Sequence, residues 1–393
     1  MAHVSHKLNN SLEGAWAYFI FIPLLYATFS YFRNRLGEPT SMQDYLGQLN
    51  AAQLAGFGFG QAPVSSAMSE NGKKPPLKIT WEPEPIAKSK WREQSVAIKR
   101  IVLLLDGSPF AAKAIPMGLK ISQVTGAQII LLSSVKNHTQ ALENEFEITR
   151  TEREQYLTGV KEELLAEGFS VECYVQPGFI ADATASLVDE LGINLVITTT
   201  RGKSGTMHWL RGGVSRKLVQ KLDIPILLVQ GDEYPDGALP SIERILVALD
   251  GSILSEQVLP YARALAKILD CELVLLSVPA VPEAKNYWAA GDVVEKLRAE
   301  AEHKMKKFLS AIARSLEAEG VKVRTLVTGS LPARTIVSVG EEEHVDMIMM
   351  TSRGRGGMDL LLSGSVAMKV VGNSPKPVFM VPIIHSEKIE ETA

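Results

Sequence analysis

Short, uninterrupted apolar runs alternate with longer amphipathic stretches through the last three quarters of the chain. Ten runs are rich in β-branched residues: IVLLL, QIILLSS, VECYV, LVITTT and PILLV, then ILVAL, LVLLSV, VKVRTLV, MIMMTS and PVFMV. Strands covered on both faces of a parallel sheet have this pattern, and stretches such as AEHKMKKFLSAIARSLEAEG between them have helical periodicity. The pattern therefore predicts an α/β fold with a Rossmann-like, doubly wound parallel sheet built by right-handed crossovers.

The pattern is written twice. Ile101–Ser108 reads IVLLLDGS and Ile245–Ser252 reads ILVALDGS, an offset of 144, whereas later landmarks from AEG to the last strand are offset by 152. The second copy therefore gains about eight residues after its second strand (152 − 144). The repeat predicts two tandem five-stranded domains, residues 97–234 and 241–384, followed by a tail at 385–393.

Near the N-terminus, residues 14–32 read GAWAYFIFIPLLYATFSYF and carry no charge. As a helix this segment would span about 28 Å, close to the thickness of a bilayer core. It predicts a membrane anchor within residues 1–36; a helix buried against protein and a cleaved signal peptide are the alternatives. Arg33 and Arg35 follow the segment directly, which favours domains that face the cytoplasm.

Residues 37–96 are rich in Gly, Ala, Ser and Pro and predict a tether. Aromatic residues are scattered through it: Phe57, Phe59, Trp81 and Trp91. Such residues are unusual in a purely flexible linker, so we expect parts of the tether to lie against the globular body or another subunit.

Composition narrows the functional classes. The 393 residues are 46% hydrophobic and 22% charged with a net charge of −3, which indicates a globular protein without the basic excess of a general nucleic-acid binder. The two cysteines, Cys173 and Cys271, have neither disulfide nor metal-ligand spacing, so we expect a reducing compartment and small buried side chains. We expect neither a metal site nor a catalytic residue set.

Two acidic residues hold matching positions. Asp106 and Asp250 end the first strand of their copies, and each is followed by Gly-Ser and a helix. Such a residue can cap the helix. It can equally accept a hydrogen bond from the ribose or the adenine amino group of a nucleotide, and the repeat is consistent with both interpretations.

A glycine-rich loop follows the fourth strand of each copy. In the second copy Thr351 is followed by Gly354, Gly364 and Ser365, with Arg353 as an added cation. The first copy keeps the spacing with Thr199, Gly202, Gly212 and Gly213. Glycine lets backbone amides approach a phosphate, and the amides that start the next helix can bind an anion. The alternative is a turn in which glycine serves the backbone alone.

With these motifs, the chain resembles a tandem universal stress protein over residues 97–383. The resemblance implies domains that pair through their last strands, here an internal pseudo-dimer, and that bind ATP or another adenine nucleotide, with Mg²⁺ if ATP is bound. The implied ligand contacts are Ala248, Asp250, Val278, Met350, Thr351, Gly354, Gly364, Ser365 and Val366. The first glycine of the family pattern is Thr in both copies, and Gly213 lacks the hydroxyl of Ser365. We therefore expect nucleotide in the second copy.

Together these features predict a membrane-tethered regulatory or sensor protein rather than an enzyme; a slow ATPase ranks last. A membrane protein or a further copy of the chain is the expected macromolecular partner. The alternative is a non-catalytic accessory or structural subunit of a membrane complex, with one or both nucleotide pockets empty.

Overall fold

The structure is a computed structural model that describes residues 91–135, 143–200, 214–230, 239–279, 291–329, 331–352 and 366–383. The predicted anchor and all but the end of the predicted tether lie outside these residues. Among the described helices, none combines the length and the apolar character needed to cross a membrane.

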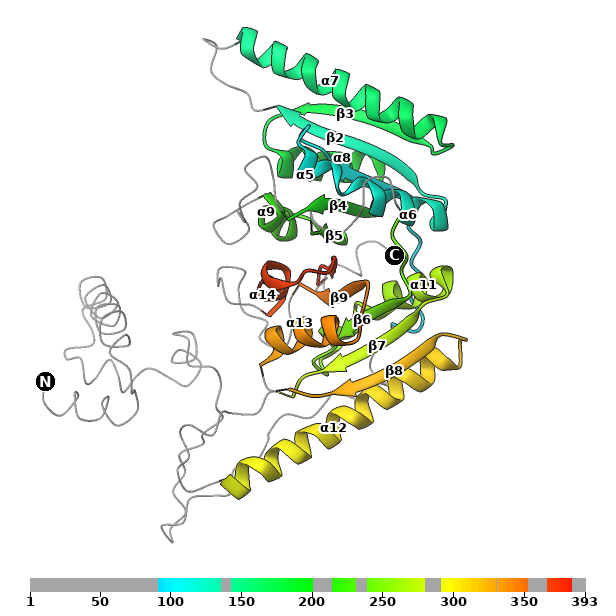
Figure 1. The fold of residues 1–393 in the computed structure, drawn as a ribbon, viewed down its shortest axis with the longest axis vertical. Coiled ribbons are helices and arrows are strands. Elements are labelled where there is room, and N and C mark those ends of the chain that lie inside the picture. The colour runs from blue at the N-terminus through cyan, green and yellow to red at the C-terminus, as the bar shows by residue number, and fades with distance from the viewer. Residues whose placement is uncertain are drawn as a thin grey trace, which may run out of the picture. The chain divides into compact units, whose positions relative to one another are not determined.

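The described residues form two halves with the same order of elements, residues 97–230 and 241–383 (Figure 1). The first half contains β1 (Arg100–Leu104), α5 (Pro109–Ala112), α6 (Ile115–Thr125), β2 (Gln128–Val135), α7 (Glu143–Ala166), β3 (Val171–Pro177), α8 (Ile180–Leu191), β4 (Leu195–Thr199), α9 (Val214–Lys221) and β5 (Ile226–Val229). The second contains β6 (Arg244–Ala248), α10 (Ile253–Glu256), α11 (Leu259–Leu269), β7 (Glu272–Ser277), α12 (Gly291–Glu317), β8 (Lys322–Val327), α13 (Pro332–Glu342), β9 (Met347–Thr351), α14 (Val366–Asn373) and β10 (Val378–Val381).

All ten predicted strands are present, in one sheet of order β3-β2-β1-β4-β5-β10-β9-β6-β7-β8. Within each half the strands are parallel, and the order reverses beside the first strand, as in a doubly wound sheet. The halves join where β5 pairs antiparallel with β10, with Leu227 opposite Phe379. The two five-stranded sheets are therefore continuous.

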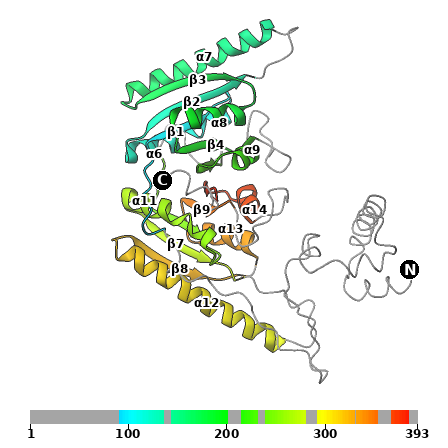
Figure 2. The same ribbon diagram turned by 180° about the vertical axis from the view of Figure 1, so that it is seen from behind.

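Helices cover both faces of this sheet, which explains why inner strands such as β4 and β9 are buried at every residue. One face carries the core cluster that includes Leu103 of β1 and Leu157 of α7. The other carries the cluster that includes Val102 of β1 and Leu187 of α8. Figure 1 shows α7 and α12 along the outermost strands, and Figure 2 shows α6 of the first half next to α11 of the second, with which it is in contact.

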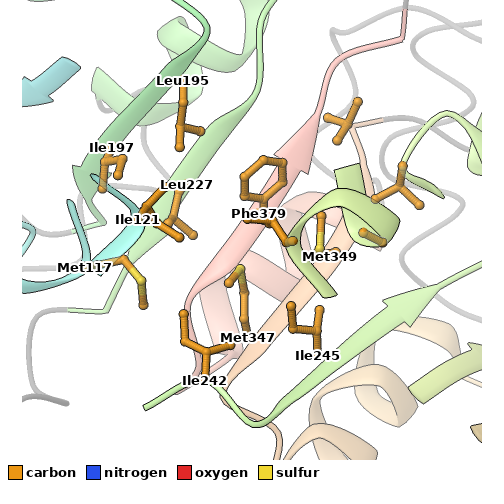
Figure 3. Close-up of a cluster of buried hydrophobic side chains, with 14 of the residues drawn as sticks. Met117, Ile121, Leu195, Ile197, Leu227, Ile242, Ile245, Met347, Met349 and Phe379 are labelled. Carbon is orange, nitrogen blue, oxygen red and sulfur yellow. The ribbon is translucent and has the colours of Figure 1, made fainter. Parts of the chain in front are cut away.

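The seam between the halves is a packed core (Figure 3). Phe379 is fully buried there, and its ring centroid lies 5.9 Å from that of Tyr261 on α11. Apolar side chains from both halves surround it: Met117, Ile121, Leu195, Ile197 and Leu227 from the first, and Ile242, Ile245, Met347 and Met349 from the second. Across the same seam, the side-chain amide of Gln230 donates to the carbonyl of Val371 over 3.2 Å. The two halves therefore share one hydrophobic core.

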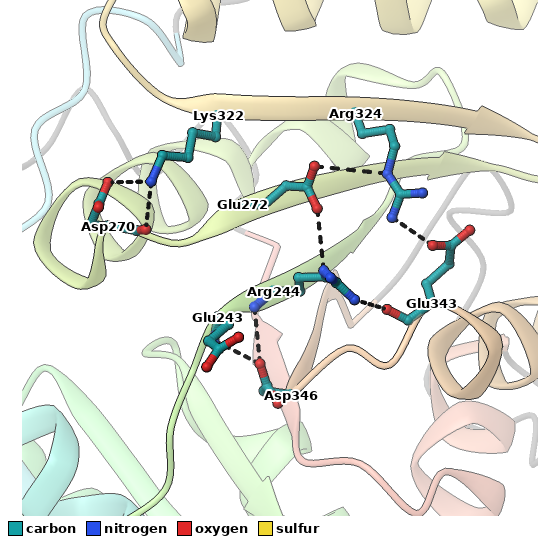
Figure 4. Close-up of polar contacts among 8 residues, drawn as sticks. All are labelled: Glu243, Arg244, Asp270, Glu272, Lys322, Arg324, Glu343 and Asp346. Carbon is teal, nitrogen blue, oxygen red and sulfur yellow. Dashed lines mark hydrogen bonds and ion pairs between the residues drawn. The ribbon is translucent and has the colours of Figure 1, made fainter.

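The amino ends of the second half's strands are held by ion pairs (Figure 4). Glu272 on β7 lies 3.4 Å from Arg244 on β6 and 3.8 Å from Arg324 on β8. Arg324 also pairs with Glu343 at 2.5 Å. The Asp346 carboxylate accepts from the backbone of Arg244 at 2.9 Å, the role that the Asn194 amide oxygen plays for Arg100 in the first half, also at 2.9 Å.

The residues directly before β1, assigned by sequence to the tether, lie against the second half. Trp91 is 2% exposed, and the guanidinium of Arg263 on α11 lies over its ring, 5.7 Å from the ring centroid. Arg92 donates to the hydroxyl of Ser315 on α12 over 2.7 Å. Arg263 in turn donates to the carbonyls of Arg92, at 2.9 Å, and Gln94. We call Trp91–Gln94 the strap, because it is bound to the second half and the chain then leads into β1 of the first half.

The two cysteines should differ sharply in reactivity. Burial raises the pKa of the Cys271 thiol to about 12, whereas Cys173 is partly exposed. Because the thiolate is the nucleophile, only about one Cys271 thiol in ten thousand is ionised at pH 8. We expect a chromogenic disulfide reagent to titrate Cys173 quickly in the native protein and Cys271 only after denaturation, with C173S as the control. A fast-reacting native thiol in C173S would contradict this burial.

The raised pKa of Cys271 also makes the contribution of this thiol to stability depend on pH. The pKa of Cys271 lies above its ordinary value of 9.0 in the folded protein, so the folded state keeps a proton that the unfolded chain loses. Its contribution to stability is intact below about pH 9 and is lost as the pH rises toward about 12.

Candidate functional site

The candidate site of the second half begins with the turn that ends β6. Gly251 has φ of 82°, in the left-handed region that favours glycine. Beyond it, the backbone amide and hydroxyl of Ser252 both donate to Oδ1 of Asp250, at 3.0 and 2.6 Å. The Ser252 hydroxyl also caps α10 by accepting from the amide of Ser255 at 3.2 Å. Ser252 is therefore the capping residue, and Asp250 is oriented by it.

Asp250 lies beside the point where the strand order reverses. β6 pairs with β7 on one side and with β9 on the other, all parallel, so the carboxyl ends of three strands meet there. In open α/β sheets, ligands bind in the crevice at this point. Besides Asp250, the ends of these strands carry four of the implied contacts, Ala248, Val278, Met350 and Thr351, and a further implied contact, Val366, begins α14.

These five residues are not equally accessible. Val278, Met350 and Thr351 are buried, Ala248 is partly exposed, and Val366 is exposed. The strand-end residues can therefore offer backbone groups and a close-packed wall, while side-chain chemistry at this edge comes from Asp250. The remaining predicted contacts lie outside the described residues: Arg353, Gly354, Gly364 and Ser365, and in the first half Gly202, Gly212 and Gly213.

The first half repeats the turn. Gly107 has φ of 71°, and Ser108 donates to Oδ1 of Asp106 from its amide at 3.0 Å and from its hydroxyl at 2.5 Å. Ser108 also caps α5 by accepting from the amide of Ala111 at 3.2 Å. The halves therefore share the same local geometry around the acidic residue.

Two side chains that sequence analysis missed distinguish the halves. Arg153 on α7 donates from Nη1 to the backbone carbonyl of Asp106, so a cation lies over the first half's turn. In the second half a carboxylate, Glu256 at the end of α10, is buried, whereas the first half has Ala112 at the matching position. Both residues lie on helices, and a charged residue in a helical sequence gives no signal that its side chain will be buried or will bond to a turn.

Among the described residues, no three His, Cys, Asp or Glu side chains come together to hold a metal ion. What the geometry offers is an oriented carboxylate at a strand-order reversal, which suits hydrogen bonding to the hydroxyls or amino group of a small polar ligand.

Comparison with known proteins decides the family. The sequence profile of the Universal stress protein family matches residues 97–230 and 241–382. The chain belongs to the universal stress protein family. It is 31% identical over 142 residues to Universal stress protein MJ0531 of Methanocaldococcus jannaschii, covering 35% of this chain and 81% of the relative. It is also 31% identical over 144 residues to Universal stress protein YxiE of Bacillus subtilis, covering 35% of this chain and 97% of that protein.

A solved structure shares the tandem fold of this universal stress protein. The crystal structure of a universal stress protein from Archaeoglobus fulgidus covers 73% of this chain and 97% of its own, with a TM-score of 0.57 and 21% identity. A universal stress protein solved in complex with cAMP covers 35% of this chain and 100% of its own, with a TM-score of 0.28 and 20% identity. The first likeness extends over both halves and shows the fold.

Proposed function

We propose that this universal stress protein is a regulatory module that binds ATP or another adenine nucleotide in its second half. The observation that carries the proposal is the Asp250 carboxylate, held by two hydrogen bonds from Ser252 at the point where the strand order reverses. There it would accept hydrogen bonds from the adenine amino group or the ribose hydroxyls. The family resemblance supports an adenine nucleotide as the ligand.

In this proposal the loop that follows β9 holds the phosphates. Its sequence supplies Gly354 and Gly364 for close backbone approach, Ser365 as a hydroxyl donor and Arg353 as a cation. If ATP is the ligand, Mg²⁺ would accompany its phosphates. Nucleotide occupancy would change the surface offered to a partner, which is a regulatory rather than a catalytic role.

The proposal extends to location on sequence grounds. The uncharged segment 14–32 would tether the protein to a membrane, with both halves in the cytoplasm and a membrane protein or a further copy of the chain as partner. A second candidate is a non-catalytic accessory subunit of a membrane complex. One observation favours it: the first half's turn already carries the Arg153 guanidinium, so at least one half can serve as a docking body without ligand.

The test is a matched pair of substitutions in the full-length chain. Gly364→Asp places a carboxylate where the proposal puts phosphate, and we expect the affinity for ATP to fall by more than about a hundredfold, equivalent to about 3 kcal/mol. Gly212→Asp makes the same change in the first half, where we expect no effect. Equilibrium dialysis with radiolabelled ATP and Mg²⁺ measures both.

The outcomes separate the two candidates. Wild-type binding of ATP that survives Gly364→Asp would show that the ligand site is misplaced. No ATP binding by the wild-type chain, with native full-length protein co-purifying with integral membrane proteins, would favour the accessory subunit.

A further inference from the structure

Helices α7 and α12 hold matching places in the two halves, and their residues correspond at the offset of 152 that also relates AEG at 166 to AEG at 318. By this correspondence Arg153 matches Met305, and Tyr156 matches Phe308. The buried residues agree, because Leu157 and Leu309 are both fully buried at the next position. Two polar side chains in the first half therefore replace two apolar ones in the second.

Arg153 and Tyr156 cover the first half's turn. The Arg153 Nη1 donates to the carbonyl of Asp106, and a Cβ atom added to Gly107 would collide with this nitrogen and lie 3.9 Å from the Tyr156 ring. The space above the turn is thus filled by the guanidinium. A ligand that approached the Asp106 backbone from this side would have to displace it.

Tyr156 completes this cover. Within the described part of the chain, its buried hydroxyl has no hydrogen-bond partner. Burial, and secondarily the Asp106 carboxylate, raise the pKa of Tyr156. The phenol therefore lies near Asp106 with little access to water, and it stays neutral at physiological pH.

The second half is built differently at the same place. Met305 is buried, and its Sδ accepts from the hydroxyl of Ser277, at the end of β7, over 3.0 Å. Phe308 is buried as well. Neither side chain can donate a hydrogen bond to a backbone carbonyl, so at these two positions α12 carries apolar groups where α7 carries a guanidinium and a phenol.

We propose that Arg153 excludes nucleotide from the first half, so that each chain binds one nucleotide, in the second half. This inference rests on the proposed function. To reach the Asp106 backbone from this side, a nucleotide would have to break the charge-assisted hydrogen bond that the partly buried Arg153 guanidinium donates to it. The two halves are therefore a binding half and a permanently closed half that resembles it.

The experiment replaces two residues of the first half with their counterparts from the second half. In the full-length chain, Gly213→Ser supplies the hydroxyl of Ser365, and Arg153→Met supplies the counterpart of Met305. Native mass spectrometry and equilibrium dialysis with ATP and Mg²⁺ give the nucleotide count per chain. We expect one for the wild type, one for G213S and two for R153M/G213S. Adding Gly364→Asp to the double variant should return the count to one.

The other possible nucleotide counts test the exclusion by Arg153 and the proposed function separately. Two nucleotides in the wild type or in G213S would overturn the exclusion by Arg153 while leaving nucleotide binding intact. One nucleotide in R153M/G213S would overturn it as well, provided that circular dichroism shows a native fold. No nucleotide in the wild type but one in R153M/G213S would refute the proposed function and support the exclusion, whereas none in either would refute both.

Discussion

Replacing Phe379 with alanine is expected to lower the free energy of unfolding by about 3–5 kcal/mol, since it removes a fully buried aromatic ring and leaves a cavity. The cavity would open where β10 pairs with β5, between side chains of both halves. The loss should therefore weaken the coupling between the halves as well as the second half itself. Guanidinium chloride unfolding followed by circular dichroism measures both the midpoint and the cooperativity of the transition.

Phe179→Ala is the matched control. This residue directly precedes α8 in the first half and is 59% exposed, with the Lys217 ammonium over its ring at 5.4 Å. We expect a change within about 1 kcal/mol. Equal losses in the two variants, or a loss below about 1 kcal/mol for Phe379→Ala, would show that the seam is not the shared core described above.

The strands could be predicted because burial on both faces leaves a strong trace in sequence. Runs such as MIMMT of β9 and ILLV of β5 are buried at every residue, and a parallel sheet between two helical layers demands this. The repeat then supplied the order of elements twice. Crossover handedness restricted the topology further, and the structure has the predicted reversal beside β1 and beside β6.

The joining of the halves was predictable only through the family resemblance. Leu227 and Phe379 lie in apolar runs like every other strand, so nothing in their own pattern says which strand pairs with which. The strap was predictable only in part. The aromatic Trp91, in a stretch rich in Gly, Ser and Pro, predicted a segment that lies against the globular body or another subunit, and Trp91 does lie against the second half. Its partner Arg263 lies 172 residues further along the chain (263 − 91), and a contact over that distance has no local sequence signal.

The candidate site also contains residues that the sequence predicted and one that it did not. Asp250 and Asp106 were singled out because Asp-Gly-Ser recurs after a strand, and the structure shows that Ser caps while Asp is held by it. Arg153 gave no such signal, because an arginine on the polar side of a helix ordinarily faces solvent. Its contact with the Asp106 carbonyl arises only when α7 packs over β2 and β3.

The second large loss of stability is expected from a substitution in the strap. Trp91 is buried against the second half, while Lys99 and Arg100, a few residues on, bond to Asn194 of the first half at 2.7 and 2.9 Å. The segment between them therefore ties the halves together on the side of α11. Trp91 fills this position with an aromatic ring whose Nε1 has no hydrogen-bond partner within the described residues.

Trp91→Ala is therefore expected to cost about 3–5 kcal/mol of unfolding free energy, through the lost burial and the cavity that replaces the ring. Arg263, which pairs with Glu319 at 3.0 Å, would also lose the ring beneath it. Trp91→Phe keeps an aromatic face and removes the unpartnered N–H, so it should cost less than half as much. Limited proteolysis should cut the strap of the alanine variant faster than that of the wild type. If the alanine and phenylalanine variants lost equally little stability, the strap would be a passive surface contact, and the seam alone would hold the two halves together.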